Sequence, residues 1–207
     1  MGPPRRERDI TTSPKEIKHI AVAAALIVGI GFSIGLYGSY FGGFNFVWTW
    51  VLMATFAAIL VVSMLTHEFA HKAVAQKNGL WAEFRLTTWG VALTFVSIFL
   101  PFRMIAPGAM MIAGTPNGDE IVKISIAGPI TNLIFSSALV AAAFSLPATG
   151  FGGMLFFAAY INAFMGVFNL IPFGILDGNK IFSFNKKLWA LAFIPSATLT
   201  VFTYLHI

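Results

Sequence analysis

Three ionisable residues near the end of an apolar run have the spacing of a metal site. His67 and His71 stand four apart, so on a helix they share one face and both imidazoles can reach a single ion. Glu68 completes the pattern H-E-x-x-H, in which two histidines hold zinc and the glutamate takes a proton from water. The pattern therefore predicts hydrolytic chemistry, with His67 and His71 as zinc ligands and Glu68 as the base.

The alternative is an interfacial cluster without a metal. Charged side chains near a helix end commonly extend to lipid headgroups, and a lone histidine there would favour that interpretation. Three ionisable side chains at the edge of an apolar segment require charged or coordinating groups that offset the cost of their burial. A bound metal ion would be such a group.

A hydrolytic zinc site takes three protein ligands and leaves one position open for water. The chain has no cysteine, and His19 and His206 lie near its two ends. The carboxylates beyond the motif are Glu83, Asp119, Glu120 and Asp177. Asp177 alone interrupts an apolar setting, "FNLIPFGILDGNK". It could be an ordinary turn aspartate before Gly178, but next to a histidine pair that lacks a carboxylate we favour it as the third ligand.

The segment before Asp177 contains two helix breakers, Pro172 and Gly174, which should end the preceding helix. Irregular backbone at membrane depth is tolerated where it lines a polar cavity. Asn169 precedes the break and has two interpretations. Its amide could hold a peptide backbone or a developing oxyanion, or it could make an interhelical hydrogen bond.

The composition indicates what must position these residues. Of 207 residues, 57% are hydrophobic and 10% charged, and the mean hydropathy is +0.82, which is typical of a multi-span membrane protein. This composition argues against nucleic-acid binding as the explanation of the +5 net charge. We expect an all-α membrane protein with five to six transmembrane helices. The main spans are expected at 19–40, 46–71, 122–146, 153–174 and 188–206.

The basic residues predict the topology. They precede the first span, follow the second, open the third and lie between the fourth and fifth, whereas the opposite turns contain none. By the positive-inside rule, the N-terminus and the ends of the second and fourth spans are cytoplasmic, in a multi-pass protein of the cell membrane. We expect a cytoplasmic tail at 1–18 and a single membrane-embedded domain at 19–207.

Residues 87–112 are apolar enough to enter the membrane, yet Arg85 and Arg103 flank their first half. A single crossing of the membrane by this segment would reverse the orientation of every later span. We therefore expect a small membrane-associated β element between the second and third main spans, and Thr, Val, Phe and Ile together with Gly90 and Pro101 favour an extended hairpin over a helix. Two short crossings are the alternative.

Three motifs resemble those of the site-2 proteases, which are intramembrane zinc metalloproteases. They are "HEFAH" at 67–71, "AGPITN" at 127–132 and "NLIPFGILDG" at 169–178, in the order found in that family. The third matches the family pattern N-x-x-P-x-x-x-x-D-G. "PFGIL" has fewer prolines than is usual there, and no PDZ or nucleotide-binding domain is recognisable.

The resemblance implies roles for the matching residues. It implies that His67, His71 and Asp177 hold one zinc ion per chain, that Glu68 is the catalytic base and that Asn169 binds the substrate or transition state. The residues that it implies as structural support are Gly128, Pro129, Asn132, Pro172 and Gly178.

The implied activity is regulated intramembrane proteolysis. The substrate would be a single-span membrane protein in the lipid bilayer, cut within or near its transmembrane segment, at a site near the cytoplasmic side. Two alternatives stay open: a membrane zinc protease that cuts outside the bilayer, and a metal transporter or non-catalytic metal-binding membrane protein.

Overall fold

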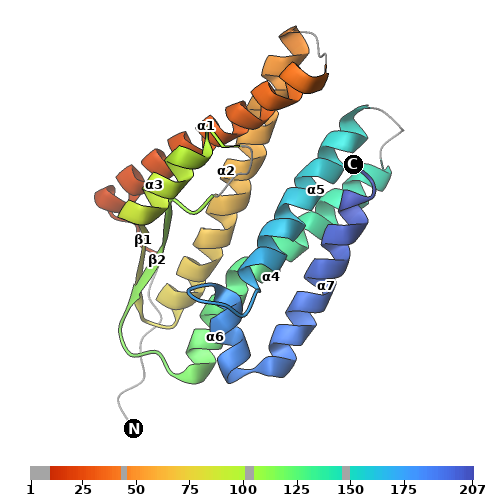
Figure 1. Cartoon of the computed structure of the whole chain (residues 1–207). Helices are drawn as coiled ribbons and strands as arrows, with labels where there is room; N and C mark the ends of the chain where they lie inside the picture. The colour runs from red at the N-terminus through yellow and green to blue at the C-terminus, as the bar shows by residue number, and fades with distance from the viewer. Residues whose placement is uncertain (1–9, 43–45, 101–104, 146–149) are drawn as a thin grey trace. The chain divides into compact units, whose positions relative to one another are not determined.

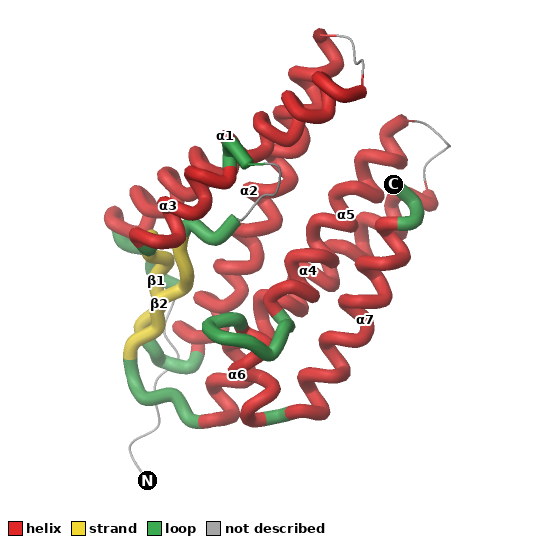
Figure 2. The backbone as a smooth tube through the Cα atoms, in the orientation of Figure 1, coloured by secondary structure: helices red, strands yellow, loops and turns green. Residues whose placement is uncertain are grey.

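The computed structural model describes residues 10–42, 46–100, 105–145 and 150–207. Figure 1 shows its helices and strands, and Figure 2 shows the same backbone coloured by secondary structure. In chain order the elements are α1 Pro14–Gly42, α2 Phe46–Lys77, β1 Trp81–Leu86, α3 Thr88–Ser97, β2 Gly108–Ala113, α4 Gly118–Ser145, α5 Gly150–Asn169, α6 Asp177–Phe184 and α7 Lys186–Tyr204.

The prediction of a multi-span all-α membrane protein with a small β element is confirmed. Among the described residues, four helices are long and apolar enough to cross a membrane, at Pro14–Ser33, Met53–Lys77, Gly118–Ser145 and Gly152–Asn169. The fifth expected span folds as α7, a helix of 19 residues that is not among these four. At 1.5 Å per residue it is about 28 Å long, close to the thickness of the hydrocarbon core.

The expected extended hairpin at 87–112 is wrong in part, because α3 separates the two strands. Thr87 starts this helix: its Oγ1 accepts a hydrogen bond from the backbone N–H of Gly90 at 3.2 Å. β1 and β2 pair into a two-stranded antiparallel sheet. The β-branched and aromatic residues of α3 are therefore helical behind a local cap, although their propensity, which is weak and context-dependent, favours a strand.

The chain separates into two compact units. The N-terminal unit comprises Thr11–Met64 and Ala82–Ile112, and the site unit comprises Leu65–Trp81 and Ala113–Ile207. α1 begins at Pro14, inside the expected tail. The division into a tail at 1–18 and one domain at 19–207 stays a prediction, and residues 1–9 of that tail lie outside the described residues.

In the N-terminal unit, α1 packs closely against α2 and supports the sheet. A Cβ on Gly31 would lie only 2.6 Å from the backbone N of Ala57, so glycine permits the close approach. Glu16 Oε1 accepts a hydrogen bond from Phe84 N at 3.0 Å, and His19 Nδ1 accepts one from Leu86 N at 3.1 Å. Two side chains of α1 therefore satisfy N–H groups of β1.

In the site unit, α4 packs against α5, α6 and α7, as Figure 1 shows for the green and blue helices. The core here consists of apolar residues from α4, the segment after α5, α6 and α7: Val122, Leu170, Ile181 and Ala192. This packing holds the start of α6, where Asp177 lies, against α4.

Candidate metal centre

The two histidines lie on one face of the C-terminal part of α2, as their spacing predicts. Both are buried, with exposed fractions of 4% for His67 and 5% for His71. Their Nε2 atoms lie 3.0 Å apart. Two nitrogen donors therefore converge on one point in the interior of the site unit.

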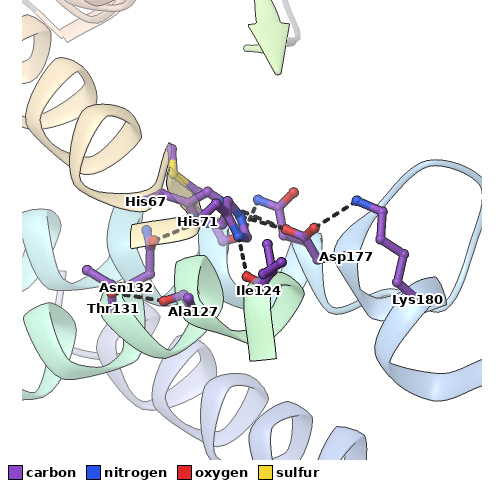
Figure 3. Close-up of polar contacts among 10 residues, drawn as sticks. His67, His71, Ile124, Ala127, Thr131, Asn132, Asp177 and Lys180 are labelled. Carbon is purple, nitrogen blue, oxygen red and sulfur yellow. Dashed lines mark hydrogen bonds and ion pairs between the residues drawn. The ribbon is translucent and has the colours of Figure 1, made fainter. Parts of the chain in front are cut away.

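Asp177 joins this pair from the first residue of α6. Its Oδ2 lies 3.0 Å from His71 Nε2 and 3.6 Å from His67 Nε2 (Figure 3). The three ligand atoms all lie within 4.8 Å of one another. Two nitrogen or oxygen ligands about 2.1 Å from a tetrahedral zinc ion would be about 3.4 Å apart. The donor set and its spacing therefore fit a zinc ion.

The groups around Asp177 favour the ionised form of its carboxyl group, which is the form that binds a metal ion. Burial by itself would raise its pKa, but the His71 and His67 imidazoles and the Lys180 ammonium outweigh burial and hold the pKa well below its ordinary value. The Nζ of Lys180 lies 3.2 Å from Asp177 Oδ1. This leaves Oδ2 directed at the histidine pair.

The chain reaches Asp177 through an irregular segment that begins where α5 ends, at Asn169. The expected break before Asp177 is confirmed: Pro172 lies in this segment, and Gly174 has a φ of 57°, a left-handed conformation that favours glycine. The side chain of Asn179 donates a hydrogen bond to the Gly174 carbonyl at 2.8 Å. The segment is therefore tied back to α6.

Gly178 allows the start of α6 to approach the end of α5. A Cβ at this position would overlap the Leu170 carbonyl group. That same carbonyl accepts a hydrogen bond from Trp189 Nε1 at 2.7 Å. The position of Asp177 is therefore set by α5 and α7 as well as by α6.

Acceptors behind each imidazole direct its Nε2 towards Asp177. His71 Nδ1 lies 2.7 Å from the carbonyl oxygen of Ile124, and His67 Nδ1 lies 2.8 Å from Asn132 Oδ1 (Figure 3). A carbonyl can only accept, so Nδ1 of His71 carries a proton, and Nε2 is the ring nitrogen that a metal could use. Such outer partners orient metal-binding histidines in general.

Gly128 lets α4 approach both imidazoles. A Cβ there would lie 2.6 Å from His67 Nε2 and closer still to His71 Nε2. Pro129 follows it inside α4, and both residues are buried. The bare backbone at position 128 therefore leaves open the space in which the donor nitrogens converge.

We expect Gly128→Ala to weaken zinc binding more than about tenfold, because the new methyl group would displace the imidazoles from the metal position. Zinc affinity, measured by competition with a chromophoric chelator, checks this. Gly166→Ala is the matched control: its Cβ would meet its nearest neighbour, the Pro129 carbonyl oxygen, at 3.4 Å, an ordinary contact. Equal zinc affinity in the Gly128→Ala protein and the wild type would contradict the expectation.

The remaining predicted residues lie as follows. Glu68 is half-buried on α2, next to His67 in the chain. Asn169 is half-buried at the end of α5, where its Nδ2 donates to the Met165 carbonyl at 3.0 Å. In this state its amide therefore bonds its own helix, and its binding role stays a prediction.

The other three carboxylates considered as a third ligand are not part of the metal group. Glu83 pairs with Arg85 and accepts a hydrogen bond from Ser13 in the N-terminal unit. Asp119 and Glu120 lie in the first turn of α4. Within the part of the chain that the structure describes, His67, His71 and Asp177 are the one such group with metal-ligand spacing.

Two groups that support the metal site were not predicted from the sequence. One is the Ile124 carbonyl, which has no signal in the sequence because any residue supplies a backbone oxygen. The other is Asn162 on α5, whose Oδ1 accepts a hydrogen bond from Asn132 Nδ2 at 3.4 Å. An amide inside a span as apolar as α5 is a recognisable signal, since polar residues at membrane depth usually have a function.

The fold and the site define a multi-span membrane protein with a buried site of two histidines and one aspartate suited to a metal ion. The comparisons with known proteins agree with this class. The chain is 36% identical over 135 residues to "Putative zinc metalloprotease MJ0611" of Methanocaldococcus jannaschii, a match that covers 62% of this chain and 69% of the relative. The chain belongs to this family of zinc metalloproteases.

Two longer relatives carry similar names. "Putative zinc metalloprotease Rip3" of Mycobacterium tuberculosis is 31% identical over 144 residues, which is 68% of this chain and 33% of the relative. "Zinc metalloprotease MJ0392" of Methanocaldococcus jannaschii is 30% identical over 165 residues, a match that covers 79% of this chain and 40% of the relative. The chain thus spans less than half the length of these two. No protein-family model and no solved structure matches it.

Proposed function

We propose that this protein is an intramembrane zinc metalloprotease of the site-2 type, which hydrolyses peptide bonds within or near the transmembrane segments of single-span membrane proteins. The observation that carries the proposal is the buried group of His67, His71 and Asp177 on elements that adjoin membrane-spanning helices. The zinc metalloprotease relatives support the hydrolytic part, and the three sequence motifs support the site-2 type.

In this proposal His67, His71 and Asp177 hold one zinc ion. When bound, zinc acts as a Lewis acid that lowers the pKa of a coordinated water from 15.7 to about 7. Glu68 accepts the proton as the water attacks the scissile carbonyl, and it delivers that proton to the leaving amine. The peptide bond breaks, and a carboxylate and an amine are released.

Asn169 holds the substrate in this scheme. Its Nδ2 would exchange the Met165 carbonyl for a substrate carbonyl or the developing oxyanion. Giving up one internal hydrogen bond costs about 1 kcal/mol, which a charge-assisted bond to an oxyanion offsets. Asn169 therefore serves the transition state better than the ground state, as catalysis requires.

We place the site near the cytoplasmic side, with the N-terminus on that side as well. The support is the distribution of basic residues: Lys72 and Lys77 follow the histidine pair, and Lys180, Lys186 and Lys187 follow Asp177. A transmembrane helix hides its carbonyls in internal hydrogen bonds. The substrate must therefore unwind locally before Glu68 and water can act on it.

The test uses two matched substrates with the purified protein in liposomes. One is a single-span membrane protein, and the other is its water-soluble tail without the span. We expect zinc-dependent cleavage of the first alone, abolished by a chelator and restored by zinc, with mass spectrometry placing the cut in or beside the span.

Two results would overturn the proposal. Cleavage confined to the soluble tail would indicate a membrane protease that acts outside the bilayer. Bound zinc without cleavage of several single-span substrates, combined with zinc flux into the liposomes, would indicate a transporter.

A further inference from the structure

A chain of hydrogen bonds leads from His67 through two buried amides to a backbone carbonyl. Asn132 Oδ1 lies 2.8 Å from His67 Nδ1, and Asn132 Nδ2 donates to Asn162 Oδ1 at 3.4 Å. Asn162 Nδ2 in turn donates to the Ala158 carbonyl at 2.9 Å. Asn132 is fully buried and Asn162 has an exposed fraction of 5%. Figure 3 shows the first of these contacts.

The direction of every hydrogen bond in this chain follows from its last member. The Ala158 carbonyl can only accept, so it fixes the amide group of Asn162 with Nδ2 towards α5 and Oδ1 towards Asn132. That oxygen can accept only from Nδ2 of Asn132, which leaves Asn132 Oδ1 facing His67. An oxygen at that position requires a proton on His67 Nδ1.

Without Asn162, either orientation of the Asn132 amide would satisfy His67. In the reversed orientation Asn132 Nδ2 would donate to His67 Nδ1, and the imidazole proton would then sit on Nε2. A protonated Nε2 has no lone pair for a metal ion. The tautomer of His67 therefore depends on which way Asn132 points.

His71 does not depend on a pair of side-chain amides for the proton on its Nδ1. His71 Nδ1 lies 2.7 Å from the Ile124 carbonyl, a backbone group that cannot reverse. The two imidazoles thus receive the same orientation by different routes, one direct and one through two side chains.

We propose that Asn162 is a positioning residue that sets the tautomer of His67 through Asn132 and so prepares Nε2 to bind zinc. This inference rests on the proposed zinc site. In this inference Asn162 affects zinc binding without contacting the metal. Its replacement should therefore lower zinc affinity less than replacement of Asn132, which contacts the imidazole.

The test compares Asn162→Leu with a matched control in the same helix pair. Ser136→Ala also removes a buried hydrogen bond from α4 to α5, because Ser136 Oγ donates to the Ala159 carbonyl at 2.7 Å, but it leaves the amide chain intact. We expect Asn162→Leu to weaken zinc binding about three- to tenfold, less than the 10- to 100-fold typical of a direct outer partner. Ser136→Ala should bind zinc like the wild type.

A second readout does not need metal. In zinc-free protein at a pH where the imidazole is neutral, ¹⁵N NMR of His67 should show the Nδ1–H tautomer in the wild type and a mixture with Nε2–H in Asn162→Leu. The expected mixture in the variant, with weaker zinc binding only there, supports the inference.

Three results overturn it: unchanged tautomer and affinity in Asn162→Leu, an equal loss of affinity in Ser136→Ala, or a wild-type His67 already mixed between tautomers. Failure of the proposed function is a separate outcome. A wild type that binds no zinc would refute the metal site, while the NMR comparison would still decide whether Asn162 sets the tautomer.

Discussion

Replacing Glu68 with glutamine should leave zinc bound and lower peptide hydrolysis by about 10²- to 10⁴-fold. Glutamine keeps the size and the hydrogen-bonding reach of glutamate but cannot accept a proton from water. His67 and His71, the ligands on the same helix, keep their positions. Metal analysis of the purified variant, together with cleavage of a single-span substrate, separates binding from catalysis.

The matched control is Glu120→Gln, the same change in the first turn of α4. Glu120 Oε2 accepts a hydrogen bond from Asn117 N, and a glutamine oxygen can do the same. This variant should cleave at the wild-type rate. Normal hydrolysis by Glu68→Gln would exclude Glu68 as the base and favour a transporter or binder, and loss of zinc from it would point to a structural role.

Replacing Asp177 with alanine should abolish stable zinc binding, with a loss of more than about 100-fold in affinity. The change removes one of three ligands and the negative charge that faces both imidazoles, whereas loss of an outer partner alone typically costs 10- to 100-fold. Zinc competition with a chelator measures the loss, and hydrolysis should fall in parallel.

Asp119→Ala is the control for removing one carboxylate from the site unit. Asp119 is exposed in the first turn of α4 and is not part of the metal group. It should bind zinc like the wild type. Zinc retained by Asp177→Ala would show that another group completes the site. That result would favour the alternative of a membrane zinc protease that cuts outside the bilayer.

Much of the site is encoded in short stretches of sequence, because helix geometry is local. The shared face of His67 and His71 follows from their spacing and from the helical periodicity of α2. The membrane class follows from composition and from the lengths of the apolar runs. The break before Asp177 follows from Pro172 and Gly174, whose backbone preferences act at their own positions.

The sequence was less informative at residues 88–97. β-branched and aromatic residues indicated a strand, and the chain instead forms α3 behind the Thr87 cap. Apolar runs of this length fit a helix or a strand almost equally well, so the choice depends on caps and on packing against neighbouring elements.

Residue types and spacing were sufficient to predict the histidine pair, the adjacent glutamate and the membrane setting, and they favoured Asp177 among four carboxylates. The packing of the helices was needed to learn that Asp177 Oδ2 lies beside both Nε2 atoms and that Gly128 leaves room for them. The same holds for the Ile124 carbonyl and the two asparagines that orient the rings. The physical reason is that these contacts join helices far apart in the chain. Their distances depend on how α2, α4, α5 and α6 pack together, which no local pattern records.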